Sequence, residues 1–292
     1  MATNTFFKGN FKCRFCSECK GLGCVGELPG MGGVNNSRNF ILNCSSWDNF
    51  AADESIPVTK DNLGIAPVTG AAQNIGFENE SDFYINYFSA AKNAGITLCV
   101  GDGAPDEKLK LGTEAIAQLN ERAYFFLKPY PNEKLYKRID FIRDKAIAIG
   151  MDIDAFNIET MRNQAKLERK SKEQIEALRN YAKLPLMLKG IFTKEDIEVC
   201  KEVKPEIIVI SNHGGRVETA TGSTAEFLSR YAEELKNYVG EIWVDGGIRK
   251  RRDVQVAKQL GATKCLVARP WISRLVKDGV PGMTTAIQRL FT

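Results

Sequence analysis

Eight short apolar runs, each of strand length, recur along the chain with longer segments of helical spacing between them. They are NLGIAPV (62–68), ITLCV (96–100), YFFL (124–127), IDAFNI (153–158), LPLMLK (184–189), EIIVIS (206–211), EIWVD (241–245) and TKCLVA (263–268). Continuous apolar runs are typical of strands buried on both faces, and helix-length spacers indicate parallel crossovers. Eight such units predict an α/β fold, a (β/α)8 TIM barrel.

The chain of 292 residues is long enough for one barrel and a small extension. We expect residues 1–50 to form a short cysteine-rich N-terminal extension and residues 51–292 to form the barrel. The alternative is an open, doubly wound sheet, which places a Gly-rich phosphate loop directly after its first strand. Residues 65–76, IAPVTGAAQNIG, lack the G-x-G-x-x-G pattern, so this alternative ranks second.

The charge pattern excludes some classes of partner. The net charge of +4 comes from 40 basic and 36 acidic residues without a long block of one sign, whereas a nucleic-acid surface needs clustered Lys and Arg. There is no run of about 18 apolar residues, and the first residues, MATNTFFKGNFKC, lack a secretory apolar core. We therefore expect a cytoplasmic protein with no membrane or nucleic-acid partner.

Four of the eight cysteines crowd into CRFCSECKGLGC, with the spacing C-x2-C-x2-C-x4-C. In a reducing compartment such a cluster indicates metal rather than disulfides. Four thiolates at this spacing suit a [4Fe–4S] cluster or a structural zinc. A third alternative is that they bind no metal. The candidate ligands are Cys13, Cys16, Cys19 and Cys24, and the other cysteines read as core residues.

Barrel enzymes build their sites at the carboxyl ends of the strands. The residues that close the eight runs are Pro67, Cys99, Lys128, Asn157 with Glu159, Lys189, Asn212 with His213, Asp245 and Arg269. Polar and ionisable groups should therefore converge at one end of the barrel.

The single histidine, His213, follows the sixth run in ISNHGGR (210–216). A lone His is usually a satisfied core or surface residue. Here two glycines allow a ligand to approach the backbone, the imidazole titrates near neutrality, and Arg216 offers a planar fork that matches a carboxylate. The motif therefore favours His213 as a base and Arg216 as an anion anchor.

DGGIR (245–249) follows the seventh run. The backbone N–H groups of Gly246 and Gly247 can line an anion, and Arg249 adds a cation. Ala268 and Arg269, after the eighth run, complete a pocket of the kind that barrels place between their last two strands. Together these segments predict a phosphate site.

Three segments, LPLMLKGIFTKEDIEVC, IIVISNHGGR and VDGGIRKRRDVQVAKQLGATKCLVARP, resemble the lysine, histidine-arginine and phosphate-binding segments of the FMN-dependent 2-hydroxy acid oxidase and dehydrogenase family, which includes glycolate and lactate oxidases. The resemblance runs in register from about residue 184 to about residue 272 and continues more weakly back to about residue 62. It implies FMN as cofactor, oxidation of a small 2-hydroxy acid to the 2-oxo acid, and a homo-oligomer.

The resemblance also implies residue roles. His213 would take the substrate proton, Arg216 would hold the substrate carboxylate, and Lys189 would neutralise charge at the flavin N1 and C2 carbonyl. Glu159 would pair with His213. The implied catalytic residues are therefore His213, Lys189 and Glu159. The implied cofactor-binding positions are Pro67, Val68, Cys99, Asn157, Lys189, Ser211, Asp245, Gly246, Gly247, Arg249, Ala268 and Arg269.

The sequence departs from the family at the substrate side. Lys128, in FFLKPY, stands where the third strand usually carries a tyrosine, and Phe126 replaces a flavin-contacting Gln. The tyrosine before the barrel and the long loop after the fourth strand have no counterpart. Lys128 therefore predicts a more anionic substrate. If the N-terminal cysteines hold an iron-sulfur cluster, the cluster could take electrons from the flavin, and the protein would be a dehydrogenase; the final electron acceptor stays open.

Two other functions compete with 2-hydroxy acid oxidation. One is a non-redox FMN enzyme similar to type 2 isopentenyl diphosphate isomerase, which shares the barrel and flavin pocket; the paired His213 and Arg216 disfavour it. The other is a flavin- or metal-binding protein without turnover.

Overall fold

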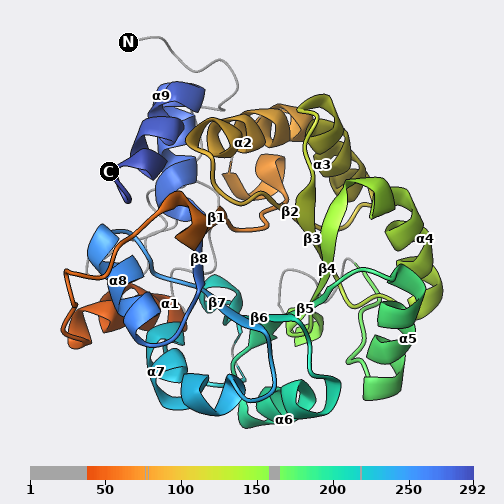
Figure 1. Ribbon diagram of the computed structural model, residues 1–292. Helices are drawn as coiled ribbons and strands as arrows, with labels where there is room; N and C mark the ends of the chain where they lie inside the picture. The colour runs from red at the N-terminus through yellow and green to blue at the C-terminus, as the bar shows by residue number, and fades with distance from the viewer. Residues whose placement is uncertain (1–37, 76, 78, 158–164, 218) are drawn as a thin grey trace.

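The computed structural model describes residues 38–292 except 76, 78, 158–164 and 218, and it is a barrel of strands surrounded by helices (Figure 1). The strands are β1 (Leu63–Ile65), β2 (Cys99–Gly101), β3 (Ala123–Leu127), β4 (Ala146–Asp152), β5 (Leu186–Ile191), β6 (Ile207–Ile210), β7 (Glu241–Asp245) and β8 (Lys264–Val267). The helices are α1 (Arg38–Ser45), α2 (Glu80–Ala94), α3 (Glu107–Gln118), α4 (Asn132–Ile142), α5 (Lys172–Ala182), α6 (Lys194–Val203), α7 (Thr224–Leu235), α8 (Arg251–Gln259) and α9 (Arg269–Gln288).

The strands pair in parallel in the order β1-β8-β7-β6-β5-β4-β3-β2. A bridge between Gly64 and Thr97 brings the two ends of this sheet together. There Ile65 N–H donates to Thr97 O at 3.1 Å, and Thr97 N–H donates to Leu63 O at 3.1 Å. The predicted (β/α)8 barrel is confirmed.

Inward-facing side chains fill the barrel, because alternate residues of each strand point to its axis. This inner cluster consists of Cys99, Phe126, Ala148, Met187, Ile207, Val209, Trp243 and Leu266. Gly150 of β4 belongs to the same packing, since a Cβ there would lie 2.6 Å from the Phe126 ring. A larger apolar core lies between the strands and the helices.

Several helices start with side chains that cap their own backbone. The hydroxyl of an N-cap Ser or Thr accepts a hydrogen bond from the third helical N–H, which satisfies a donor that the helix leaves open. The pairs are Ser171 with Gln174 in α5, Thr193 with Asp196 in α6 and Ser223 with Glu226 in α7. These caps define where each loop from the carboxyl end of a strand turns into a helix.

The position of the fourth strand differs from the prediction. IDAFNI (153–158) was expected to form it, but β4 is the preceding segment AIAIGMD, and Ala155–Asn157 forms a 3₁₀ turn. The strand contains alanines and a glycine, which have low strand propensity, because the Phe126 ring occupies the space beside Gly150. The carboxyl end of β4 is therefore Asp152 and not Asn157.

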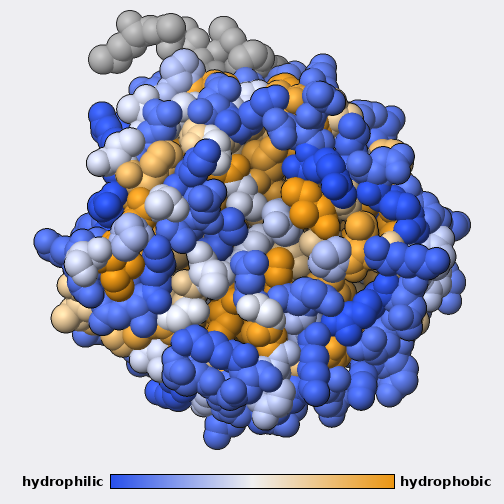
Figure 2. All heavy atoms as spheres, in the orientation of Figure 1, coloured by the Kyte–Doolittle hydropathy of each residue, from blue (hydrophilic) through white to orange (hydrophobic). Residues whose placement is uncertain are grey.

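Helix α1 packs against the loop after β6, so residues 38–45 already belong to the packed structure. The boundary at residue 50 stays a prediction, and Cys13, Cys16, Cys19 and Cys24 lie outside the described residues. In the described part of the chain, no helix is both long and apolar enough to cross a membrane. Hydrophilic residues dominate the outer helices, and apolar residues show mainly toward the middle of the face in Figure 2.

Candidate active site

A cavity of about 300 Å³ lies at the carboxyl ends of the strands. It brings together most of the predicted site residues: Pro67, Val68, Lys128, Lys189, His213, Arg216, Asp245, Gly246, Gly247, Arg249, Ala268 and Arg269. Lys108, which was not predicted, also lines it. Among the described lining residues there are six Lys or Arg side chains and one carboxylate, Asp245, so the cavity is suited to anions.

Four predicted residues are not among those that line the cavity. Cys99 is 1% exposed and packs in the inner cluster of the barrel. Ser211 is fully buried, and its Oγ accepts a hydrogen bond from His213 N–H at 3.1 Å. Asn157 ends the turn after β4, and Glu159 lies outside the described residues. Their implied roles stay predictions.

His213 begins a short 3₁₀ turn, His213–Gly215, just after β6. Its φ of 56° lies in the left-handed region, which is uncommon for residues other than glycine. The Oδ1 of Asn212 accepts a hydrogen bond from Gly215 N–H at 3.0 Å and helps to fix the turn. Gly215, at φ 93°, has no room for a side chain, because a Cβ would lie 2.6 Å from Phe40 N. This strain is maintained by the surrounding packing.

Helix α1 supplies that packing through two asparagines. Asn43 Nδ2 donates to Asn212 Oδ1 at 2.7 Å, and Asn43 Oδ1 accepts from Asn212 Nδ2 at 3.1 Å and from Thr224 N–H at 3.0 Å. One turn earlier, Asn39 Nδ2 donates to Val217 O at 2.7 Å. The α1 helix therefore holds the histidine turn from outside the barrel.

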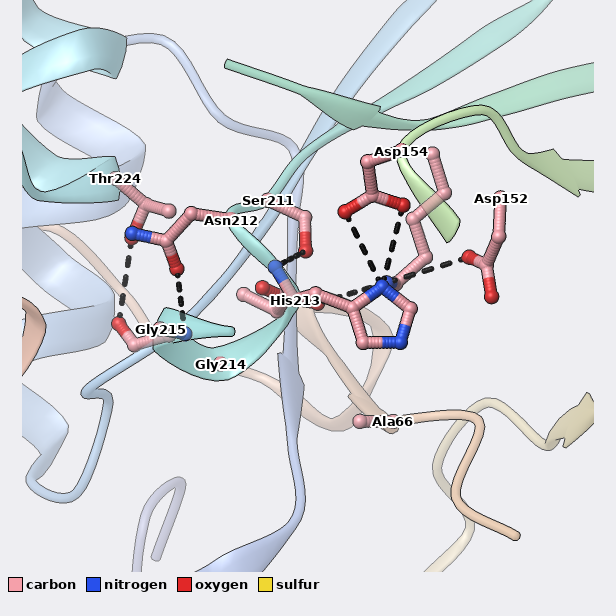
Figure 3. A network of polar contacts seen from close by, with 12 residues as sticks. Ala66, Asp152, Asp154, Ser211, Asn212, His213, Gly214, Gly215 and Thr224 are labelled. Atoms are coloured by element: carbon pink, nitrogen blue, oxygen red, sulfur yellow. Dashed lines mark hydrogen bonds and ion pairs between the residues drawn. The ribbon is translucent and has the colours of Figure 1, made fainter. Parts of the chain in front are cut away.

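The His213 imidazole is turned toward the carboxylate of Asp154 (Figure 3). Nδ1 lies 3.2 and 3.1 Å from the two carboxylate oxygens. Burial, followed by the charges of Lys128 and Lys189, lowers the pKa of His213 well below its usual value. Burial raises the pKa of Asp154 to about 7. The two groups share one proton and titrate as a pair.

A chain of opposite charges runs beside this pair. Lys128 Nζ lies 2.6 Å from Asp152 Oδ2 and 3.5 Å from His213 Nε2. Lys189 Nζ lies 3.3 Å from Asp152 Oδ1 and 3.6 Å from Asp245 Oδ2. Burial alone would lower the pKa of Lys189, but the neighbouring carboxylates outweigh it and raise the pKa. Lys189 is therefore charged at neutral pH.

Asp152, Asp154 and His213 each offer one ligand atom, all within 4.8 Å of one another. A cation there would meet the ammonium groups of Lys128 and Lys189, which already lie on Asp152. The electrostatics of this cluster therefore favour proton transfer over metal binding.

Three guanidinium groups, those of Arg216, Arg249 and Arg269, also line the cavity. Burial, then the charges of Arg216 and Arg249, lowers the pKa of Arg269 to about 9. Among the described residues, the Nε atoms of Arg216 and Arg269 have no hydrogen-bond partner. Gly246 and Gly247 have φ values of 96° and 78°, and a Cβ on Gly247 would clash with the backbone of α1. Crowded cations beside a glycine-lined backbone are suited to a phosphate.

Comparison with known proteins decides the family. Residues 120–292, more than half of the chain, match the model of the family described as FMN-dependent dehydrogenase. The chain belongs to the FMN-dependent dehydrogenase family. A peroxisomal (S)-2-hydroxyacid oxidase of Arabidopsis thaliana is 35% identical over 118 residues, which are 40% of this chain and 32% of that protein. The 2-hydroxyacid oxidase 2 of Bos taurus is also 35% identical over 118 residues, 40% of this chain and 33% of that protein.

The matched segment thus spans about a third of the length of these two relatives. Solved structures extend the similarity in fold over most of the chain. A mandelate oxidase with (S)-mandelic acid has a TM-score of 0.70 and 24% identity, over 92% of this chain and 88% of that one. A flavocytochrome b2 with sulfite bound has a TM-score of 0.70 and 19% identity, over 88% of this chain and 73% of that one.

The sequence reading missed Asp152, Asp154 and the asparagines of α1. The two aspartates stand in MDID, an alternation that places both carboxylates near the end of β4 once that strand is positioned correctly. Asn39 and Asn43 are four residues apart in RNFILN, which places them on one face of a helix. Their contacts in the barrel are distant in sequence, so no local pattern predicts them.

Proposed function

We propose that this protein binds FMN and uses it to oxidise a small anionic 2-hydroxy acid to the 2-oxo acid. The observation that carries the proposal is the His213–Asp154 pair, because a buried imidazole with its Nδ1 on a carboxylate can present Nε2 as a base. Two 2-hydroxy acid oxidases among the relatives support the substrate class. His213 takes the proton of the substrate hydroxyl.

The residues at the cavity fit FMN. Arg249 and Arg269, with the backbone of Gly246 and Gly247, would hold the phosphate, since crowded guanidinium groups need an anion to relieve their repulsion. Lys189 would neutralise the negative charge that reduction adds at the flavin N1 and C2 carbonyl. When bound, FMN supplies a two-electron acceptor for the substrate.

Arg216 is the proposed anchor for the substrate carboxylate. It lines the same cavity as His213, three positions further along the chain, and its Nε has no partner among the described residues. A planar fork holds a carboxylate in one orientation, which directs the adjacent hydroxyl toward the base. Lys108 and Lys128 add positive charge to the wall, which supports a substrate that carries more than one anionic group.

The reduced flavin needs a further acceptor for the electrons that it takes from the substrate. If the four N-terminal cysteines bind a [4Fe–4S] cluster, the protein passes electrons from flavin to the cluster and is a dehydrogenase. Anaerobically purified protein would then show visible absorption beyond the flavin bands. Zinc in place of iron, or no metal after reconstitution with iron and sulfide, would remove this part and leave the flavin site unaffected.

The whole proposal is tested by loading the protein with FMN and mixing it anaerobically with a panel of mono- and dicarboxylic 2-hydroxy acids. We expect at least one acid to bleach the flavin without another reductant, because the substrate itself provides both electrons. Flavin binding without bleaching by any acid would favour the non-redox alternative. Failure to bind FMN at micromolar concentration would refute the proposal.

The pH dependence follows from the shared proton. Below a pH of about 7, Asp154 holds a proton and donates it to Nδ1, so that the imidazole proton sits on Nε2, where it blocks the base. Above it, the carboxylate accepts from Nδ1–H and Nε2 is free. We therefore expect kcat/KM to rise with pH through a pKa of about 7, measured as the rate of flavin reduction. A rate that does not change between about pH 5.5 and about pH 8.5 would contradict this assignment.

A further inference from the structure

The amine of Lys128 lies beside the nitrogen of His213 that would act as the base. Lys128 directly follows β3, and its side chain is 8% exposed. Its Nζ is 2.6 Å from Asp152 Oδ2 and 3.5 Å from His213 Nε2. Asp152 fixes the ammonium group with the shorter contact and thereby aims it at the imidazole. Asp154, two residues after Asp152 at the end of β4, contacts the other ring nitrogen.

These two contacts act on different ring nitrogens and favour the same arrangement of the proton. An ammonium group has hydrogens and no lone pair, so it can only donate, and it favours an imidazole whose Nε2 carries a lone pair. A carboxylate can only accept, and it favours an imidazole whose Nδ1 carries the hydrogen. The Lys128 and Asp154 contacts therefore select the same tautomer, with the proton on Nδ1 and the lone pair on Nε2.

We propose that Lys128 acts on both the base and the substrate: its ammonium group, anchored on Asp152, directs the His213 proton to Nδ1 and keeps the Nε2 lone pair available to the substrate. A hydroxyl oxygen that enters between Lys128 Nζ and Nε2 accepts from the ammonium group and donates its own hydrogen to the imidazole. Lys128 thereby orients the hydroxyl and stabilises the negative charge that builds on its oxygen. The inference rests on the proposed function only for the identity of this hydroxyl.

Other charges also face the imidazole, and their effects differ in sign. Removal of the Lys128 charge should make it easier to protonate the His213–Asp154 pair, because a nearby cation disfavours the added proton. Asp152 opposes this effect, and the remaining cations act in the same direction as Lys128. The groups that face His213 are Lys128 from β3, Asp152 and Asp154 from the end of β4, Lys189 from β5 and Arg216 from its own loop.

The single histidine allows a direct test, because the imidazole ¹⁵N signals of the full chain loaded with FMN report one residue. In the parent protein at about pH 8 we expect the shifts of an Nδ1–H tautomer. In Lys128→Met we expect a population of the Nε2–H tautomer and a rise of about one unit in the pKa at which the pair titrates. In Lys128→Arg, which keeps the charge, we expect the parent tautomer.

Lys108→Met is the matched control, because it removes another buried ammonium group from the wall of the same cavity. We expect it to leave the tautomer of His213 unchanged. The proposal is overturned if Lys128→Met keeps both the parent tautomer and the parent titration, or if Lys128→Arg shifts the titration as far as Lys128→Met does. Circular dichroism of each variant checks that the fold is intact.

The spectra need no turnover, so they separate this inference from the proposed function. If no 2-hydroxy acid reduces the flavin but the tautomer responds to Lys128→Met, only the proposed substrate class fails. If an acid reduces the flavin and the tautomer does not respond, only the role of Lys128 fails. A shift in the pH profile of flavin reduction by the same amount as the NMR titration would link the two.

Discussion

His213→Gln is expected to lower the rate of flavin reduction by the substrate about 10²- to 10⁴-fold, the range that a positioned general base contributes. Glutamine keeps the size of the side chain and can still donate an amide hydrogen to Asp154, but it has no group that takes a proton near neutral pH. FMN should remain bound, because the proposed phosphate residues come from β7 and β8. Stopped-flow absorbance of the anaerobic flavin measures the rate.

Chemical rescue separates loss of the base from structural damage. In His213→Ala the missing ring leaves a space above Asp154, and added imidazole should restore part of the rate as a soluble base. The restored rate should increase with the concentration of neutral imidazole, and therefore with pH. A His213→Gln enzyme as fast as the parent would mean that another group takes the proton, and the proposed role of the histidine would be wrong.

Much of the fold follows from the sequence because a parallel barrel strand is buried on both faces, and its continuous apolar run is a local signal. β7 was predicted at the residues that form it, and the remaining strands except β4 overlap their predicted runs. β4 was not predicted because it contains Gly150, and glycine has a low strand propensity. The glycine is needed because the Phe126 ring fills the space where its side chain would lie. The packing partner that explains the glycine lies on β3.

The error in β4 also explains what was missed at the site. With the strand ending at Asp152, the next side chains to reach the cavity end are carboxylates, whereas the misplaced strand drew attention to Asn157 and Glu159. His213, Arg216, Lys189 and the glycines could be predicted, because each lies in or shortly after a strand whose apolar run is visible in the sequence. The Asn43 contacts could not, since they join residues 169 positions apart.

The buried charges of Lys128 and Asp152 depend on each other. Lys128 would be costly to bury alone, and so would Asp152, but their 2.6 Å contact satisfies both. A lysine at the third strand and an aspartate at the fourth are therefore linked features of this site, and neither is interpretable from its own segment. The resemblance implies a tyrosine hydroxyl on the third strand, and in this chain the Lys128–Asp152 ion pair stands in its place.

Arg216→Lys is expected to raise the KM for the 2-hydroxy acid about 10- to 100-fold, which corresponds to the loss of a charged hydrogen bond. Lysine keeps the charge but replaces two parallel N–H donors with a point charge, so the carboxylate loses its fixed orientation. Burial lowers the pKa of Arg216, so its charge lacks compensation from the protein and an anion should bind there. Steady-state kinetics and titration with a 2-oxo acid, followed by the flavin spectrum, measure the effect.

Arg269→Lys is the matched control, because it makes the same change in a second guanidinium of the cavity. Arg269 Nη2 donates to Gly214 O at 2.9 Å and belongs to the proposed phosphate site, so its replacement should weaken FMN binding and leave the KM of the fully loaded protein nearly unchanged. The two variants should therefore have opposite profiles for substrate and cofactor. If Arg216→Lys weakens FMN and spares the substrate, the carboxylate lies elsewhere in the cavity, and Lys108 becomes the first residue to replace.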